Sequence, residues 1–538
     1  MKHTFFKIFF LTVAITTMVS CSKKIDEAYQ NPNADVKVAV EQLLPGIEAS
    51  MVGNTAFHGT ANDMRFIGRY IQNWQLSTSG DLYDQMGGVQ TDNATSTWRT
   101  HYYDLGQNLN NMIKWSGDDK KWDYVGVGQA IFAWSWLTIS DHYGEVILKE
   151  AFNTSQLTFK YDTQEDVYAY VRQLCFTSLD NLNKTGDGVS QANLALGDAY
   201  FYNGDVTKWK KFVYGILARS YNHLSNKANY KPDSVIYYAN LSIKSNADNA
   251  TLKYTPTGNN RSANFNGPYS NNGIGSLRQS EYSVKLLTGA NAALAGVVDP
   301  RRWYFFKTNP NGTFVGVTPN KGVTAIANVS DRPNNFYGST NTTTVAPAGG
   351  NDIGCTYIFR NYAESPVLTA SEVQFMIAEA ALRKGETGTA MTAYKLGISL
   401  NFDMLSNLYS TNIAPANVIT DGTKNAYLAN PLVVPATLTL THIMLQKYIS
   451  LWGHGILETW VDMRRYHYID PDPATGKQVY ADFAIPTGIN LYVDNGGKPV
   501  YRVRPRFNSE YVWNLNELIR IGADKPDFHT KESWFSQK

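Results

Sequence analysis

Two consecutive helical patterns between residues 371 and 400 constrain the fold more than any other feature of the sequence. Ser371 and Gln374 have the spacing of a capping box, which predicts a helix with Ser371 as its N-cap and Gly385 just beyond its last turn. The apolar face of this helix consists of Val373, Met376, Ile377, Ala380 and Ala381. A second helix is expected from about Gly388 to Leu400, with one face made of Ala390, Ala393, Tyr394, Gly397 and Ile398. Small residues on two helices joined by a short turn predict a unit of the tetratricopeptide type, in which antiparallel helices pack closely.

Four further segments show apolar residues at three- and four-residue spacing, which predicts helices at 107–115, 124–140, 165–182 and 208–224. Three long segments rich in Asn, Gly, Thr and Ser separate the helical patterns, at about 245–280, 308–352 and 470–499. Loops of this length inside a compact domain are usually functional or mobile. No Pro- or Ser-rich linker divides the chain. The sequence therefore predicts a mostly α protein in which residues 21–538 form a single domain, a helical core with large loop insertions.

The charge balance and the aromatic content narrow the class of ligand. Of 538 residues, 43% are hydrophobic, which is ample for a large core, and only 17% are charged. A net charge of +2 gives no electrostatic reason to bind nucleic acid, which requires clustered Lys and Arg, so we expect no nucleic-acid partner. Aromatic residues make up 13% of the chain, and tyrosine is the most frequent of them. A surface with few charged residues and many tyrosines suits uncharged polar ligands better than ionic ones.

The first twenty residues have the features of a signal peptide. A short basic start precedes an apolar run from Ile8 to Val19, which is too short to span a membrane, and the small residue Ser20 stands just before Cys21. This arrangement resembles a bacterial lipobox, which predicts removal of residues 1–20 and acylation of Cys21, for example by palmitate. The mature protein would then be held at a membrane by lipid without crossing it. An ordinary secretory signal followed by a chance cysteine is the alternative.

The two remaining cysteines, Cys175 and Cys355, are too few for a disulfide framework. Cys175 lies in an apolar helical pattern that is typical of a buried small side chain. We expect both residues to be free thiols.

A search for catalytic motifs favours no enzyme. Asp141 and His142 are adjacent at a predicted helix end, where neighbouring side chains point in different directions, so helix-terminal hydrogen bonds explain them better than a proton relay. His454 stands between two glycines without a second ligand at metal spacing, which indicates a helix-terminating turn. Zinc-protease, nucleophile-elbow, phosphate-loop and Cys-x-x-Cys motifs do not occur. We expect no catalytic residue, no metal ligand and no cofactor, although a pair of carboxylates that meet only in space would leave no sequence motif.

Aromatic residues in polar loops are the better candidates for a ligand site. The set is Trp74, Tyr83, Trp98, Tyr269, Phe336 and Tyr337, each surrounded by Asn, Asp, Ser, Thr or Gly. A flat ring can stack on the face of a sugar while a neighbouring amide hydrogen-bonds to its hydroxyls. The alternative for each ring is that it fixes a loop to the core, because large aromatic side chains are mostly buried.

Motifs that follow one another along nearly the whole mature chain resemble the SusD/RagB family of nutrient-binding outer-membrane lipoproteins. After the lipobox these are Tyr29–Asn33, Ala130–Trp134, Asp141–Val146, Tyr202–Asp205 with Lys208-Trp209, Asp299-Pro300-Arg301, Ser371–Ala380, Gln446-Lys447-Tyr448, Trp460–Arg465, Arg504-Pro505 and Asn514-Leu515-Asn516. Each motif is weak by itself, and their order carries the resemblance.

The resemblance implies a fold, a location and a partner. The fold would contain four tetratricopeptide-like helical pairs in a right-handed superhelical scaffold, with a loop-rich region that carries few short strands and binds the nutrient. The protein would face the cell exterior as a lid over a SusC-like TonB-dependent outer-membrane transporter and deliver to it a glycan, such as an oligosaccharide. Three alternatives stay open: a peptide or another nutrient as ligand, a helical scaffold that only docks proteins, and an exported glycoside hydrolase.

Overall fold

The computed structural model describes residues 37–53, 59–87, 95–256, 263–338, 342–505 and 507–538. The predicted signal peptide and Cys21 lie outside these residues. The chain divides into two compact units, Met1–Ala39 and Val40–Lys538, and all the elements named below belong to the second unit. Within the described residues, no helix combines the length and the apolarity that crossing a bilayer requires.

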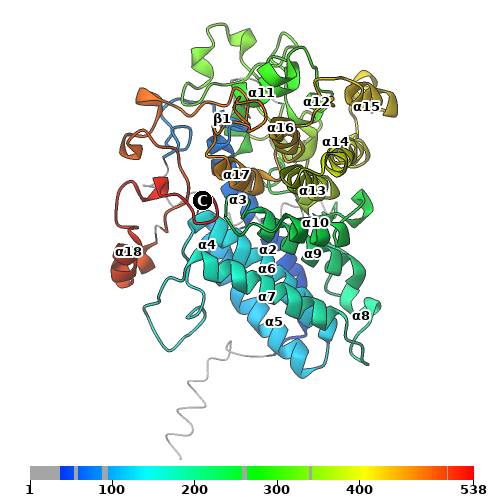
Figure 1. The fold of residues 1–538 in the computed structure, drawn as a ribbon, viewed down its shortest axis with the longest axis vertical. Helices are drawn as coiled ribbons and strands as arrows, with labels where there is room; N and C mark the ends of the chain where they lie inside the picture. Colours follow the sequence, from blue (N-terminus) through cyan, green and yellow to red (C-terminus); the bar gives the residue numbers. More distant parts are fainter. Residues whose placement is uncertain (1–36, 54–58, 88–94, 257–262, 339–341, 506) are drawn as a thin grey trace, which may run out of the picture. The chain divides into compact units, whose positions relative to one another are not determined.

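The unit from Val40 to Lys538 is mostly helical, as predicted (Figure 1). Its first half contains α2 (Val40–Val52), α3 (Thr60–Tyr70), α4 (Ser96–Arg99), the π-helical turn η1 (Thr100–Gly106), α5 (Gln107–Asp118), α6 (Trp122–Tyr143), α7 (Gln164–Leu182), α8 (Gln191–Ala195), α9 (Val206–Asn222) and α10 (Pro232–Leu241). Its second half contains α11 (Glu281–Thr288), α12 (Arg302–Phe305), α13 (Ala370–Lys384), α14 (Thr387–Tyr409), α15 (Asp421–Leu428), α16 (Leu440–Ser450), α17 (Ile456–Arg465) and α18 (Leu515–Ile521). The four helices predicted in the first half correspond to α5, α6, α7 and α9.

Helices that follow one another in the sequence pack as neighbours, notably α6 with α7, α9 with α10 and α13 with α14. In the last pair, Gly385 adopts φ 81° and ends α13, as predicted, and α14 begins two residues later. Ala380 is fully buried, so the predicted apolar face does pack inward. The N-cap prediction was wrong by two residues: Thr369 caps α13 by accepting a hydrogen bond from the Glu372 backbone N–H, while Ser371 lies inside the helix and donates to the Gly397 carbonyl.

Two short antiparallel strand pairs fasten the loops to the helices. β1 (Trp74–Leu76) pairs with β3 (Leu277–Gln279), in the register Trp74 opposite Gln279. β2 (Ala250–Leu252) pairs with β4 (Ser365–Leu368), and β4 leads directly into the N-cap of α13. The second pair therefore holds the end of a long loop region against the helical scaffold.

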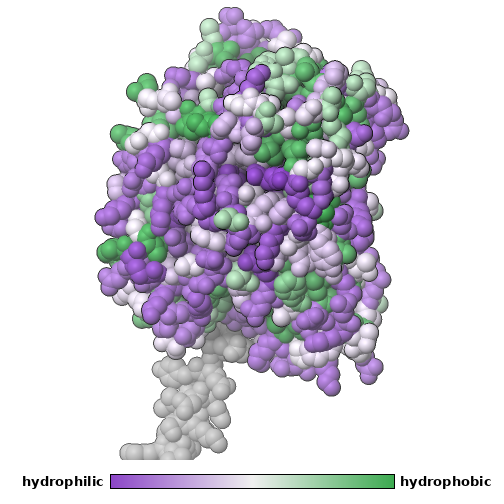
Figure 2. Space-filling view, viewed as in Figure 1, coloured by the Kyte–Doolittle hydropathy of each residue, from purple (hydrophilic) through white to green (hydrophobic). Residues whose placement is uncertain are grey.

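The segments predicted as loop insertions contain only short 3₁₀ turns and the strands β2 and β3 among their described residues. Those between 245 and 352, green in Figure 1, lie at the end of this unit opposite α5. Figure 2 shows polar side chains over most of one face, with apolar side chains in small separate groups. Cys175 and Cys355 are both buried and unpaired, as predicted.

Candidate functional site

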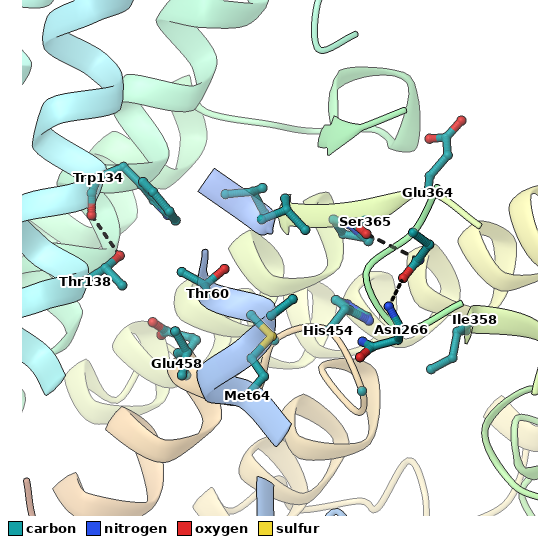
Figure 3. Close-up of a pocket in the computed structure, with 18 of the residues that line it drawn as sticks. Thr60, Met64, Trp134, Thr138, Asn266, Ile358, Glu364, Ser365, His454 and Glu458 are labelled. Atoms are coloured by element: carbon teal, nitrogen blue, oxygen red, sulfur yellow. Dashed lines mark hydrogen bonds between the residues drawn. The ribbon is translucent and has the colours of Figure 1, made fainter. Parts of the chain in front are cut away.

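A pocket with about 950 Å³ of empty space, part of it open to solvent, lies where α3, α6 and α17 meet β4 and the loops around residues 265 and 358 (Figure 3). Its wall is largely apolar and includes Val52, Ala61, Met64, Trp134, Leu137, Ile358, Phe359, Pro366, Val367, Tyr409, Leu457 and Val461. Its polar groups come from Thr60, Thr138, Asp141, His142, Arg219, Asn264, Asn266, Glu364, Ser365, His454 and Glu458. A mostly apolar wall with a few converging polar groups is typical of small-molecule sites.

Local hydrogen bonds position the loop side of the pocket. The Asn264 side chain donates to the Ala363 carbonyl at 2.7 Å and accepts from the Asn266 backbone N–H at 2.8 Å. The Asn264 backbone N–H donates to the Asn361 carbonyl at 2.7 Å. These bonds attach the loop to the segment that leads into β4, and they place the Asn266 side chain at the pocket beside His454 (Figure 3).

The turn between α16 and α17 supplies His454. Gly453 has φ 80°, which L side chains rarely adopt, and its backbone N–H donates to the Asn73 side chain at 3.1 Å. A Cβ at this position would lie 2.6 Å from Ile358 Cδ1, so glycine also permits the close approach of the opposite wall. The prediction that this motif ends a helix is confirmed; the sequence did not indicate that its histidine faces a pocket.

Three pocket-lining residues have a buried polar atom without a hydrogen-bond partner among the described residues: His454 Nε2, Asn266 Oδ1 and His142 Nε2. His454 and Asn266 lie beside each other (Figure 3). Burial lowers the pKa of His454 to about 4, so the imidazole is neutral at pH 7. A neutral imidazole nitrogen donates or accepts according to its tautomer, and an amide oxygen accepts. Buried polar groups without a partner cost free energy, which a ligand that supplies hydrogen bonds recovers.

The charged residues at the pocket hold one another. Arg219 Nη2 lies 2.6 Å from Glu372 Oε1, and Arg219 Nε lies 3.2 Å from Glu458 Oε2. These ion pairs belong to a largely buried network of five cations and five carboxylates from α6, α13, α16, α17 and the C-terminal end of α9, with the further members Asp141, His223, Glu379, Arg383, Lys447, Asp462 and Arg465. Paired charges are not free to bind an ionic ligand. The half-buried Glu364 lies at the pocket edge and points away from His454 and Asn266 (Figure 3).

His223 lies within this network. Its Nε2 is 3.0 Å from Glu458 Oε2 and its Nδ1 is 3.4 Å from Asp141 Oδ2. Burial disfavours the charged imidazole, but the two carboxylates outweigh burial and raise the pKa of His223 to about 9. His223 is therefore a buried cation at neutral pH.

The neighbours Asp141 and His142 contact different partners, as predicted. Asp141 accepts a hydrogen bond from the Tyr168 hydroxyl, while His142 Nε2 lies 3.8 Å from Asp63 Oδ2. Burial lowers the pKa of His142 to about 3. Among the described residues, no group of His, Cys, Asp or Glu has the arrangement of a metal site.

Five of the six aromatic residues predicted to bind ligand are buried, with exposed fractions of 8% or less: Trp74, Tyr83, Trp98, Phe336 and Tyr337. Trp74 packs edge-on against Phe336, Phe359 and Trp452 at centroid distances of 5.8 to 6.1 Å, and Trp98 packs against Tyr143, Tyr161 and Phe507. In this structure these rings hold loops on the core, which was the alternative stated above, because a ring without an exposed face cannot stack on a sugar. They do not line the pocket, although Phe359 connects the Trp74 cluster to its wall.

Tyr269 is the half-exposed member of the set, with its ring 6.3 Å from that of Tyr362. It also does not line the pocket. A ligand role for Tyr269 stays a prediction. Nothing in the sequence marks Asn266, Met64 and Trp134 as pocket residues, because the walls of the pocket meet only in the folded chain.

Comparisons with known proteins agree with this architecture. A family profile named SusD-like and described as starch-binding and associating with the outer membrane matches residues 32–489. No curated protein matches the chain. A SusD/RagB family protein from Bacteroides thetaiotaomicron is 22% identical with a TM-score of 0.67, and the match covers 93% of this chain and 99% of that one.

Two further solved structures are similar in the same way. A SusD homolog from Bacteroides fragilis is 18% identical with a TM-score of 0.66, covering 93% of this chain and 100% of that one. A chitin-binding SusD homolog from Flavobacterium johnsoniae is 16% identical with a TM-score of 0.67, covering 92% and 98%. At these identities the structural matches show the fold alone.

Proposed function

Because the chain belongs to the SusD-like family, whose description is starch-binding and associating with the outer membrane, we propose that it binds an oligosaccharide or polysaccharide at the cell surface. In this proposal Cys21 carries the lipid that anchors the protein to the outer membrane, facing the exterior. A SusC-like TonB-dependent transporter receives the ligand. The protein acts by binding and carries out no reaction.

The observation that carries the proposal is the neighbouring pair of unpartnered polar atoms, His454 Nε2 and Asn266 Oδ1, in a pocket that combines an apolar wall with further polar groups. A sugar offers hydroxyls that both donate and accept, together with apolar C–H faces that suit the half-buried side chain of Met64. An ionic ligand would meet neither a free cation nor a free carboxylate beside these two atoms.

The state of Glu458 excludes this residue as the general acid of a hydrolase at this site. Glycoside hydrolysis requires a protonated carboxylic acid beside a second carboxylate. Burial favours the protonated form of Glu458, but His223, Lys447 and Arg219 outweigh it and hold the pKa of this carboxyl well below its usual range. Glu458 is therefore ionised and cannot act as the general acid.

Calorimetry on protein lacking residues 1–21 tests the proposal, with maltooligosaccharides and chitooligosaccharides as ligands. His454→Ala and Asn266→Ala should each weaken binding by about 5- to 150-fold, which corresponds to about 1–3 kcal/mol for a lost hydrogen bond at a buried site. Asn425→Ala, at an exposed position on α15, is the matched control and should bind as the wild type does.

Full affinity in both folded pocket variants would show that the ligand binds elsewhere. Binding of peptides in place of every glycan would support the alternative nutrient class, with the same transporter partnership. A wild-type protein that binds no small ligand but still binds the transporter would support a docking scaffold.

A further inference from the structure

Two buried acids, Glu48 of α2 and Asp198 in the turn between α8 and α9, have no role in the site described above. Both side chains are 0% exposed. We propose that their carboxyl groups share one proton, and that this proton acts as a pH-sensitive latch that holds α2 in the fold. α2 is the first helix after the segment that carries Cys21, and its last residue, Val52, lines the pocket. The latch therefore acts on the helix that leads along the chain from the proposed anchor to the pocket wall.

Asp198 is supplied with donors on both of its oxygens. Its Oδ1 accepts from the Tyr202 backbone N–H at 2.8 Å. Its Oδ2 accepts from the Gly204 backbone N–H at 2.9 Å and from the Trp209 indole N–H at 2.7 Å. Burial raises the pKa of Asp198, while these hydrogen bonds and the Glu48 side chain act to lower it. The donors therefore favour the negative charge of the pair on Asp198.

Glu48 has no such donors. Among the described residues, no N–H or O–H group donates to either of its carboxyl oxygens. Leu44, one turn earlier on α2, packs so closely on the residue before Asp198 that a Cβ on Gly197 would lie 3.1 Å from the Leu44 Cβ. The Glu48 side chain lies within hydrogen-bonding distance of the Asp198 carboxylate. Two carboxylates cannot form a hydrogen bond with each other, but a carboxylic acid donates to a carboxylate, so the proton of the pair belongs on Glu48.

The electrostatics of the pair agree with this geometry. A buried carboxylate without a cation or a donor costs more free energy than a neutral acid in the same place. Burial and the charge of Asp198 both raise the pKa of the Glu48 carboxyl well above its usual range. Because the two groups interact, they titrate as a pair, and at neutral pH the pair holds one proton.

The neighbouring charged groups do not compensate for an ionised Glu48. α2 packs against α3, η1, α5 and β2, and β2 carries no ionisable side chain. Asp104 of η1 is an acid and offers no positive charge. The other ionisable groups of these elements and of the start of α6 have partners elsewhere: Glu41 with Lys121, Lys114 with Asp118, Arg69 with Asp81, Arg65 with Asn62, Asp63 with Thr97, His101 with Ser135, Asp123 with the Tyr124 backbone, and the Tyr124 hydroxyl with the Asn193 carbonyl.

α2 is a helix that the loss of one buried hydrogen bond can release. Pro45 lies inside it and removes a backbone hydrogen bond of the helix. Glu48 follows Pro45 by three residues, so its side chain holds the part of α2 beyond this weak point. Ionisation leaves two carboxylates side by side without water, and opening of α2 hydrates Glu48. Opening therefore releases the proton, and a rising pH favours it.

Urea unfolding tests the shared proton in protein lacking residues 1–21, with the wild type, Glu48→Gln and Glu48→Leu compared between about pH 5.5 and 7.5. A glutamate in an unfolded chain is ionised over this range, because its pKa is about 4.3. Unfolding of the wild type then releases one proton that neither variant holds. The unfolding equilibrium constant of the wild type should therefore rise about tenfold per pH unit relative to both variants. Glutamine can still donate to Asp198 and leucine buries no polar group, so the two variants remove the proton with different packing.

Hydrogen exchange tests the latch itself. The backbone amides of α2 in the wild type are compared with the same amides in Glu48→Gln at each pH, which cancels the intrinsic pH dependence of exchange. Protection of α2 should fall in the wild type relative to the variant as the pH rises, by up to about tenfold per unit. Glu41→Gln is the matched control, since it removes from the same helix a carboxylate that is paired with Lys121, and it should keep the pH dependence of the wild type in both measurements.

A ratio of unfolding constants that stays constant with pH, in whichever Glu48 variant folds, overturns the shared proton. Protection of α2 that changes with pH in the same way in the wild type and in Glu48→Gln overturns the latch. Loss of the pH dependence in Glu41→Gln would assign the proton to another acid and also overturns the inference. These measurements use no glycan, so their failure is distinct from a failure of the proposed function.

Discussion

His223 shows how a single buried group makes the stability of this protein depend on pH. In an unfolded chain its pKa is about 6.5, and in the folded protein Asp141 and Glu458 raise it to about 9. A pKa raised on folding contributes stability that is complete below the unfolded pKa. That contribution is lost as the pH rises through the folded pKa.

We expect the free energy of unfolding to fall between pH about 6.5 and 9 by on the order of 3 kcal/mol through this residue. His223→Gln removes the titrating group, so the variant should be less stable than the wild type at pH 6 and should approach it at pH 9. Urea unfolding at both pH values measures this difference. His467 titrates with the same sign through Asp470 and Glu532, but it is present in both proteins and cancels in the comparison. A constant gap between the two proteins over this range would contradict a charged His223.

Gly453 is a second residue whose backbone decides the shape of the site. Gly453→Ala forces a side chain into φ 80° and 2.6 Å from Ile358 Cδ1, so it should lower the free energy of unfolding by about 1–3 kcal/mol. Gly388→Ala is the matched control, because Gly388 lies near the start of α14 without neighbours within 4 Å and should be neutral or slightly stabilising. Thermal unfolding compares the two, and equal melting temperatures would show that the turn tolerates a Cβ.

Contacts between residues far apart in the sequence explain why most of the aromatic residues predicted to bind ligand are buried. Trp74 lies in a polar stretch of sequence, and its burial comes from Phe336, Phe359 and Trp452, which are hundreds of positions away. Local composition cannot reveal contacts of that separation. His454 did stand out in the sequence, but its direction depends on the packing of α17 against the rest of the fold.

At the scale of elements, periodicity predicted the long helices well, because their apolar faces repeat over several turns. Periodicity predicted the ends of the helices less well, as the N-cap of α13 shows. Thr369 and Glu372 also have capping-box spacing, yet the Glu372 carboxylate binds Arg219 at 2.6 Å. A capping box would direct the Glu372 carboxylate to the N-cap backbone, but in the structure this carboxylate is paired with Arg219. β4 also extends to Leu368, directly before Thr369.

Ala380 on α13 provides the test of the predicted helix face. Ala380→Trp adds a large side chain to a fully buried position and should destabilise the protein by about 1–3 kcal/mol or more. Ala169→Trp, at an exposed position on α7, makes the same chemical change where there is space and should shift the melting temperature little. Differential scanning calorimetry of both variants decides the matter. A destabilisation of equal size would mean that burial at Ala380 is not the cause.

For the whole molecule, the sequence resemblance predicted the family and the mostly helical fold, since both depend on motifs spread along the chain. The pocket could not be predicted in this way, because its walls come from seven or more separate segments between Val52 and Val461. The identity of the ligand could not be predicted either, because the motifs that carry the family resemblance lie mainly in the helical scaffold.

Anchoring is a property of the whole molecule that remains a prediction. Cys21→Ala removes the proposed acylation site and should move the protein from the outer-membrane fraction to the soluble fraction. Fractionation after a salt wash, in cells that lack the proposed transporter partner, measures the distribution. Retention of the variant in the outer membrane would contradict lipid attachment at this residue.

The contact between Trp74 and Trp452 also determines how late in the synthesis of the chain this part of the core can be completed. The Tyr448 hydroxyl donates to the carbonyls of Ile71 and Gln72 at 2.9 Å, and α3 packs against α17, so the early part of the chain is completed by its last quarter. Loop closure over such distances is slow, and α17, one of the helices that pack against α3, is not complete until Arg465 has been synthesised. A growing chain must therefore leave the side of Trp74 that contacts Trp452 and the side of α3 that contacts α17 uncovered until its last quarter has been synthesised.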